Sequence, residues 1–137
     1  MSDTQFDAYK ETQPRAVDLY TQSLSSLAGG VGHDLRMGHP LPLYITHAEG
    51  AHKWDADGRE YIDYGMGNAA IFLGHAPPEV LKAMHRALDS GFHFGNDHPL
   101  QVEWAELVQA LVPCADRIRF VNSGSEGSML ALRIARA

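Results

Sequence analysis

The sequence lacks most features that mark secreted, membrane or nucleic-acid-binding proteins. Its 137 residues include one cysteine, Cys114, which excludes an internal disulfide and favours a reducing cytoplasm. The formal net charge of -6 gives no general attraction to nucleic acid or to an anionic membrane. No apolar run reaches the ~20 residues of a membrane span. The polar start also lacks the basic-then-apolar order of a secretory signal. A cytoplasmic globular protein is therefore expected.

Metal-binding patterns are also missing from the sequence. None of the eight histidines forms a His-x3-His pair, and a single cysteine cannot build a thiolate site. We expect no metal site. Cys114 follows Pro113 at the end of an apolar helix pattern, so it is predicted to fill a core position. His75, in a turn between Gly74 and Ala76, is predicted to have a structural role.

Apolar periodicity and turn residues predict the elements before residue 117. Residues 1–11 look frayed. The acids of the turn at 55–58 are interpreted as turn residues and solvated charges rather than as calcium ligands. A helix beginning near Pro14 carries one apolar stripe, which can pack on its own domain. The predicted helices span residues 14–28, 77–88 and 99–112, and the predicted strands span residues 43–48, 51–55 and 60–64.

The last stretch, residues 117–137, predicts a strand, a small polar turn and a helix. The first amides of a helix have no internal partner and lie at the positive end of its dipole, which favours an anion. Gly124 lets a ligand approach the backbone, and Ser123 and Ser125 add hydroxyl donors. Ser123 and Glu126 also fit a capping box, which is a structural explanation of the same residues. Both explanations stay open.

These residues carry a resemblance to a known family. The segment FVNSGSEGSMLALRIARA resembles the phosphate-binding segment of class III aminotransferases, and is most similar to their glutamate-1-semialdehyde 2,1-aminomutase branch. Further matches occur upstream in the same order: GGV at 29–31, WDADGREYIDY at 54–64 and LGHAPPEV at 73–80. Several ordered motifs are more specific than one glycine-rich turn.

The resemblance implies an α/β fold of the aspartate-aminotransferase type, fold type I of pyridoxal-phosphate enzymes. Residues 1–75 would form an N-terminal helix, a substrate-side loop and a three-stranded meander, and residues 76–137 would begin the large cofactor domain. Ser123, Gly124 and Ser125 would bind the phosphate of pyridoxal 5'-phosphate. The resemblance also implies a homodimer, and packing across that dimer is the alternative for the helix that begins near Pro14. The implied substrate is a small molecule, either an amino donor or an amino aldehyde.

Two residues are expected on the substrate side by the same resemblance. Arg36 corresponds to an arginine that contacts a substrate carboxylate, although the nearby Asp34 could pair with it instead. Asn68 lies in a glycine-rich loop, residues 65–76, that lines the substrate pocket in the family. There the family's serine and tryptophan are replaced by Gly67 and Asn68, so the pocket should differ in shape. This leaves another amino-acid or amine transaminase as an alternative to a mutase.

The catalytic lysine of the family has no counterpart in the sequence. Pyridoxal-phosphate chemistry needs a lysine that binds the cofactor's aldehyde and moves protons, and the family places it far downstream. The lysines present, Lys10, Lys53 and Lys82, do not match it and are expected to be solvated charges. We therefore expect an N-terminal fragment, inactive alone, with no catalytic residue in this chain. A stand-alone anion-binding module is the rival hypothesis.

Overall fold

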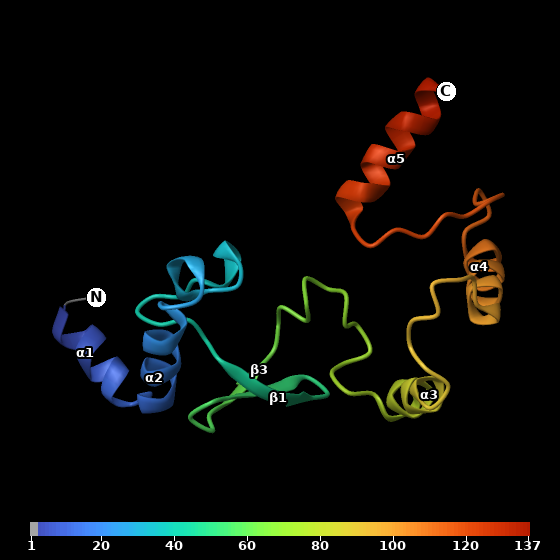
Figure 1. Cartoon of the computed structure of the whole chain (residues 1–137). Coiled ribbons are helices and arrows are strands. Elements are labelled where there is room, and N and C mark those ends of the chain that lie inside the picture. The colour runs from blue at the N-terminus through green and yellow to red at the C-terminus, as the bar shows by residue number, and fades with distance from the viewer. Residues whose placement is uncertain (1–2) are drawn as a thin grey trace. The chain divides into compact units, whose positions relative to one another are not determined.

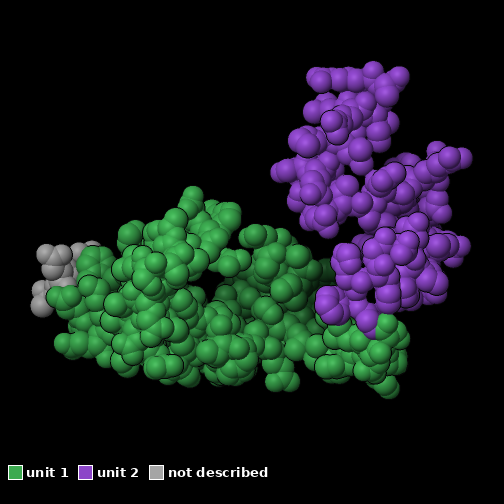
Figure 2. Space-filling model, in the orientation of Figure 1, with its two compact units in different colours: residues 1–90 green, residues 91–137 purple. Residues whose placement is uncertain are grey.

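A computed structural model describes residues 3–137, in which the chain divides into two units at the Ser90–Gly91 bond (Figures 1 and 2). The first unit contains α1 (Asp3–Glu11), α2 (Pro14–Ser23), η1 (Ala28–Gly30), η2 (Asp34–Arg36), β1 (Ile45–Glu49), β2 (His52–Asp55), β3 (Glu60–Ile62) and α3 (Pro78–Leu88). The second unit contains α4 (Pro99–Leu111) and α5 (Gly124–Arg136). The division at residue 75 concerns the domains of a complete enzyme and stays a prediction.

The strands form one antiparallel sheet in the order β1-β2-β3 (Figure 1). Glu49 pairs with His52 across the first turn, and Trp54 pairs with Glu60 across the second. At the second turn Gly58 has a φ of 81°, which glycine adopts without a side-chain clash. The three predicted strands are confirmed, with ends that differ by one or two residues.

Asp55 organises the second turn through its carboxylate. Oδ1 accepts the N–H groups of Asp57 at 3.0 Å and Arg59 at 2.8 Å, and Oδ2 accepts the hydroxyl of Tyr61 at 2.7 Å. Burial alone would raise the pKa of Asp55, but the hydrogen bonds from Arg59, Tyr61 and Asp57 outweigh it and lower the pKa below its ordinary value. Burial and the Asp55 carboxylate raise the pKa of Tyr61. The prediction of a turn role for this acid is confirmed, whereas the prediction that it is a solvated charge is wrong, because Asp55 is buried.

The helix α1 corrects the expectation that residues 1–11 are frayed, since residues 3–11 are helical and only residues 1–2 lie outside the description. The segment contains no glycine or proline to interrupt the helix. Lys10 lies 3.5 Å from Asp7 one turn earlier. The hydroxyl of Thr12 then donates to the Tyr9 carbonyl at 2.7 Å, which closes the end of the helix.

Helix α2 begins at the predicted Pro14 but ends at Ser23, one turn before the predicted end. Ser23 and Ser25 explain the early end, because their hydroxyls donate to the carbonyls of Tyr20 at 2.8 Å and Gln22 at 2.7 Å and compete with the helical backbone. Ser23 Oγ also lies 2.7 Å from the Gly30 carbonyl oxygen, so its single proton is shared between two carbonyl groups. The turn after α2 is thereby fastened to η1. The other two predicted helices are confirmed as α3 and α4.

In the second unit, the predicted strand at residues 117–121 is wrong, because the structure has no regular strand there. A strand needs a partner for its backbone groups, and the described part of this unit contains only helices and loops. A ring contact holds the segment instead. The rings of Phe120 and Trp104 stack with centroids 3.9 Å apart and an interplanar angle of 11°.

Few apolar side chains are buried in the described residues. Ala16 and Leu41 are buried, whereas most apolar side chains of α3, α4 and α5 are exposed. These include Leu81, Met84, Leu88, Val102, Leu107, Leu111, Met129, Leu132 and Ile134. Cys114 is exposed as well, so the prediction that it fills a core position is wrong for this chain. It lies in the connection between α4 and α5.

None of the helices in the described part is long and apolar enough to cross a membrane. Within residues 3–137 there is also no group of three or more His, Cys, Asp or Glu side chains placed to hold a metal ion.

Candidate functional site

The first turn of α5 carries the predicted anion site. Ser123 is the N-cap, with extended backbone angles of φ -150° and ψ 159°, and its Oγ accepts the N–H of Glu126 at 3.2 Å. The Glu126 carboxylate accepts the N–H of Asn122 at 2.7 Å rather than that of Ser123. The Ser123 half of the predicted capping box is therefore confirmed, and its reciprocal contact is shifted by one residue. The start of α5 is therefore fixed by two hydrogen bonds, one to the Ser123 hydroxyl and one to the Glu126 carboxylate.

This arrangement leaves donors available at the start of the helix. Among the described residues, the N–H groups of Gly124 and Ser125 have no acceptor. A Cβ built on Gly124 would meet no atom within 4 Å, so the space beside this backbone is open. Ser123 Oγ accepts one bond and keeps its own proton, and Ser125 is exposed. The three residues therefore present two amides and two hydroxyls at the positive end of a helix dipole, which fits a phosphate group.

Arg36 lies at the end of η2, on an exposed turn. His33 starts the turn by accepting the N–H of Leu35 at 3.1 Å, and the Met37 N–H donates to the Asp34 carbonyl at 3.0 Å. In the described chain Arg36 and Asp34 do not form an ion pair, so the competition considered from the sequence is not observed. The guanidinium fork of Arg36 remains available to a carboxylate.

Asn68 lies in the loop 65–76, where several non-glycine residues have left-handed backbone angles. Its φ is 59°, and Met66 and Ala69 have values of 40° and 66°. Asparagine tolerates this region better than most residues, whereas alanine and methionine do not. The loop is closed internally by the N–H of Ile71, which donates to the Met66 carbonyl at 3.0 Å. The side chain of Asn68 is exposed on this strained loop.

A cluster around Asp63 lies at the base of this loop, and the sequence did not predict it. The Asp63 carboxylate is buried and lies 2.9 Å from Lys53 Nζ and 2.8 Å from His75 Nε2. Hydrogen bonds from His75 and then from Lys53 lower the pKa of Asp63 far below its ordinary value of 3.8, against the opposing effect of burial. The prediction that Lys53 is a solvated charge is therefore wrong, because β2 directs it at this carboxylate. The predicted structural role of His75 is confirmed by the same contact.

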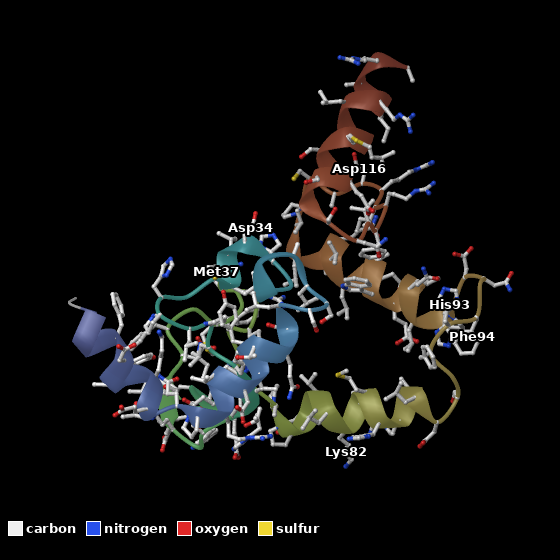
Figure 3. The ribbon with its side chains drawn as sticks, turned by 60° about the vertical axis from the view of Figure 1, so that its left-hand side comes forward. Asp34, Met37, Lys82, His93, Phe94 and Asp116 are labelled. Atoms are coloured by element: carbon white, nitrogen blue, oxygen red, sulfur yellow. The ribbon has the colours of Figure 1, made fainter. Side chains whose placement is uncertain are left out.

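The other two lysines differ from Lys53. Lys10 pairs at the surface with Asp7, and Lys82 projects outward from α3 (Figure 3). Both are solvated charges, as predicted. The candidate residues are distributed between the units: Arg36 and Asn68 belong to the first, and Ser123, Gly124 and Ser125 belong to the second. Sequence reasoning missed the Asp63 cluster because its members lie 10 and 12 residues apart along the chain.

Comparison with known proteins gives consistent results. A family model described as aminotransferase class-III matches residues 35–137. The glutamate-1-semialdehyde 2,1-aminomutase of Aquifex aeolicus is 40% identical over 121 residues, which cover 86% of this chain and 28% of the relative. The chain thus spans less than a third of the length of such relatives.

Solved structures agree on the fold. An omega-transaminase from Sphaerobacter thermophilus matches with a TM-score of 0.88 and 34% identity, over 93% of this chain and 29% of its own. A transaminase with pyridoxal phosphate bound matches with a TM-score of 0.86 and 32% identity, over 90% of this chain and 29% of its own. The helices and small sheet are therefore part of the α/β fold of these transaminases, as predicted.

Proposed function

The chain belongs to the class-III aminotransferase family, and from this premise we propose that it is the N-terminal part of a pyridoxal-phosphate enzyme that moves an amino group between an amine carbon and a carbonyl carbon. The observation that carries the proposal is the start of α5. Its unpaired Gly124 and Ser125 amides, capped geometry and open space form a phosphate cradle within the family's matched segment.

Ser123, Gly124 and Ser125 would hold the cofactor's phosphate through backbone amides and hydroxyls. The N-cap bond to Glu126 keeps these amides aligned before any ligand arrives, so little ordering is needed on binding. When bound, pyridoxal phosphate supplies an electron-withdrawing ring that stabilises negative charge next to the amino group.

The substrate side would be formed by Arg36 and Asn68. Arg36, without a carboxylate partner in the described residues, would bind the substrate carboxylate bidentately. Asn68 would line the pocket from the loop 65–76. The curated relative is an aminomutase, so glutamate-1-semialdehyde or a similar amino aldehyde is the first substrate to test. Gly67 and Asn68 stand where the resembled aminomutases have serine and tryptophan, so the pocket should differ in shape. A transaminase that acts on another amino donor is therefore the alternative.

The chain would be incomplete as an enzyme. Its lysines have other positions and partners, so none would act on the cofactor. The exposed apolar faces of α3, α4 and α5 support a chain whose neighbours are supplied by further sequence, rather than an independent binding module. A cytoplasmic homodimer remains our prediction for the complete protein.

The phosphate cradle can be tested by titration of the 137-residue chain with pyridoxal phosphate and with pyridoxal, which lacks the phosphate. Gly124→Asp introduces a residue that is favourable at a helix start, so the helix should still form. Its negative charge would repel the phosphate and its side chain would occupy the open space, so we expect at least about 10-fold weaker binding of pyridoxal phosphate. Ser128→Ala changes a serine of α5 outside its first turn and should bind normally. The cradle would be refuted if the unchanged chain bound pyridoxal phosphate and pyridoxal equally well. It would also be refuted if Gly124→Asp bound pyridoxal phosphate as tightly as the unchanged chain does.

The reaction is tested on the complete protein. Glutamate-1-semialdehyde and an amine–keto acid pair should be assayed side by side, because the aminomutase consumes the first and a transaminase the second. Turnover by the 137-residue chain alone would contradict the proposal that this chain is incomplete.

A further inference from the structure

We propose that Asp63 is a positioning residue that fastens both ends of the loop 65–76 and thereby fixes the backbone of Asn68. The geometry stands without a cofactor, whereas its consequence for substrate binding rests on the function proposed above.

The first end of the loop is held by one carboxylate oxygen. Asp63 follows β3 and is tied to the sheet by its own N–H, which donates to the Ala51 carbonyl at 2.7 Å. Its Oδ1 then accepts the N–H of Gly65 at 3.0 Å and of Met66 at 3.2 Å. The chain therefore turns away from the sheet at a fixed point.

The other oxygen holds the far end. Asp63 Oδ2 lies 2.8 Å from His75 Nε2. The His75 backbone also pairs with Gly50 in both directions, at 2.9 and 2.8 Å. A Cβ on Gly74 would lie 3.1 Å from the Gly50 carbonyl oxygen, so the returning chain passes close to the β1–β2 turn. One side chain thus joins the two ends of a loop about a dozen residues long.

Lys53 completes the brace from the neighbouring strand. Its Nζ lies 2.9 Å from Asp63 Oδ1, and its side chain is only 25% exposed. A buried carboxylate is costly without partners, and here the ammonium, the imidazole and two backbone amides satisfy it. The carboxylate is therefore held in one orientation. Because both loop ends are hydrogen-bonded to it, their positions relative to each other are fixed as well.

The loop needs such a brace because of its backbone. Non-glycine residues with left-handed φ persist only where surrounding contacts determine them. Met66, Asn68 and Ala69 all have such angles, and the N–H of Met66 donates a hydrogen bond to the Asp63 carboxylate. Loss of the brace should release these residues to the extended or right-handed regions, and with them the direction in which Asn68 presents its amide.

The test uses the 137-residue chain without cofactor, with NMR of the loop amides. Asp63→Ala should speed hydrogen exchange at Gly65 and Met66 by at least about 10-fold, and it should change the HN–Hα coupling of Asn68, which reports φ. Exchange in the paired strands β1 and β2 should stay within about 2-fold. Asp57→Ala is the matched control. Asp57 lies on the same hairpin, but its carboxylate accepts hydrogen bonds from α2, so this variant should leave the coupling of Asn68 unchanged.

A pair of His75 variants separates positioning from packing. His75→Gln can still donate from its amide to Asp63 and should restore the Asn68 coupling lost in His75→Ala. If Asp63→Ala loosens the whole sheet, the two His75 variants, whose sheet keeps Asp63, show whether the contact with Asp63 fixes the backbone of Asn68. Unchanged Asn68 coupling in His75→Ala, or failure of glutamine to restore it, overturns the proposal.

The two proposals fail separately. These measurements need no pyridoxal phosphate, so a chain that fails to bind the cofactor can still show the brace. Conversely, Asp63→Ala should bind pyridoxal phosphate with an affinity within about 2-fold of the unchanged chain, because the cradle lies on α5 in the other unit. An Asp63→Ala chain that loses cofactor binding, with its loop unchanged, would refute a role confined to the loop.

Discussion

The carboxylate of Asp57, in the turn between β2 and β3, accepts the N–H of Ala16 at 3.1 Å and caps helix α2. The same carboxylate accepts the Arg15 N–H at 2.9 Å, whereas the N-cap residue Gln13 makes no side-chain cap. A guanidinium N–H of Arg59 donates to the Thr12 carbonyl beside it. The helix start is therefore held by residues more than 40 positions away, within the same chain.

Asp57→Ala should remove this cap. We expect the free energy of unfolding of the first unit to fall by about 1 kcal/mol, which is typical of a lost N-cap. Hydrogen exchange at the α2 amides is the direct measurement. Asp57→Asn keeps one acceptor oxygen and should lose less. Equal stability of Asp57→Ala and the unchanged chain would show that the two contacts contribute nothing.

Gly30→Ala should destabilise the turn after α2 more than Gly58→Ala does. Both glycines have left-handed φ, at 74° and 81°, so both substitutions cost about 1 kcal/mol of backbone strain. Only at Gly30 would the new Cβ also lie 2.6 Å from a Tyr20 ring carbon, whereas at Gly58 it meets nothing within 4 Å. Overpacking adds roughly 1–3 kcal/mol, measured as the difference between the two variants in denaturant unfolding. Equal losses would contradict the ring contact.

The sequence was sufficient for the elements whose signals are local. Proline starts, glycine stops and the Asp57-Gly58 turn located α2, α3, α4 and the three strands, and Ser123 was identified as a helix cap. The resemblance supplied the fold, because ordered motifs along the chain matched one family. The first kind of signal depends on residues near one another in sequence, and the second depends on the order of several short motifs along the chain.

The errors at Lys53, Cys114 and residues 117–121 concern features that depend on distant partners. The sequence predicts a solvated charge at Lys53 because Asp63, the acid that Lys53 contacts, lies ten residues away along the chain. Residues 117–121 alternate like a strand, but a strand also requires a neighbour that the second unit does not contain. Cys114 is exposed for a similar reason. Local pattern cannot show whether a tertiary partner is present.

The stability of the first unit should depend on pH through Asp63. Its pKa is lowered in the folded chain by His75 and Lys53, so the unfolded chain binds the proton first as pH falls. The stabilisation is present above the ordinary value of 3.8 and is lost as the pH falls below it toward the lowered value. Denaturant unfolding between about pH 5 and pH 2 should therefore show a steeper pH dependence for the unchanged chain than for Asp63→Asn.

The control for this titration is Asp116→Asn, which changes an exposed aspartate of the second unit (Figure 3). Its slope should match that of the unchanged chain. Asp55 also has a lowered pKa, so part of the acid sensitivity should remain in Asp63→Asn. Identical slopes for Asp63→Asn and the unchanged chain would contradict the linkage.

The second unit offers a test of what replaces the missing strand. If the Trp104–Phe120 stack holds residues 117–121, Phe120→Leu should lower the stability of this unit by about 1 kcal/mol, as aromatic pairs contribute 0.5–1.5 kcal/mol beyond their buried area. Tryptophan emission should shift to longer wavelength, because the Trp104 ring loses its cover. Trp54, in the first unit, adds a constant background. Phe92→Leu removes a ring that is 87% exposed and should change neither quantity. An unshifted emission in Phe120→Leu would mean that the segment is held by its backbone alone.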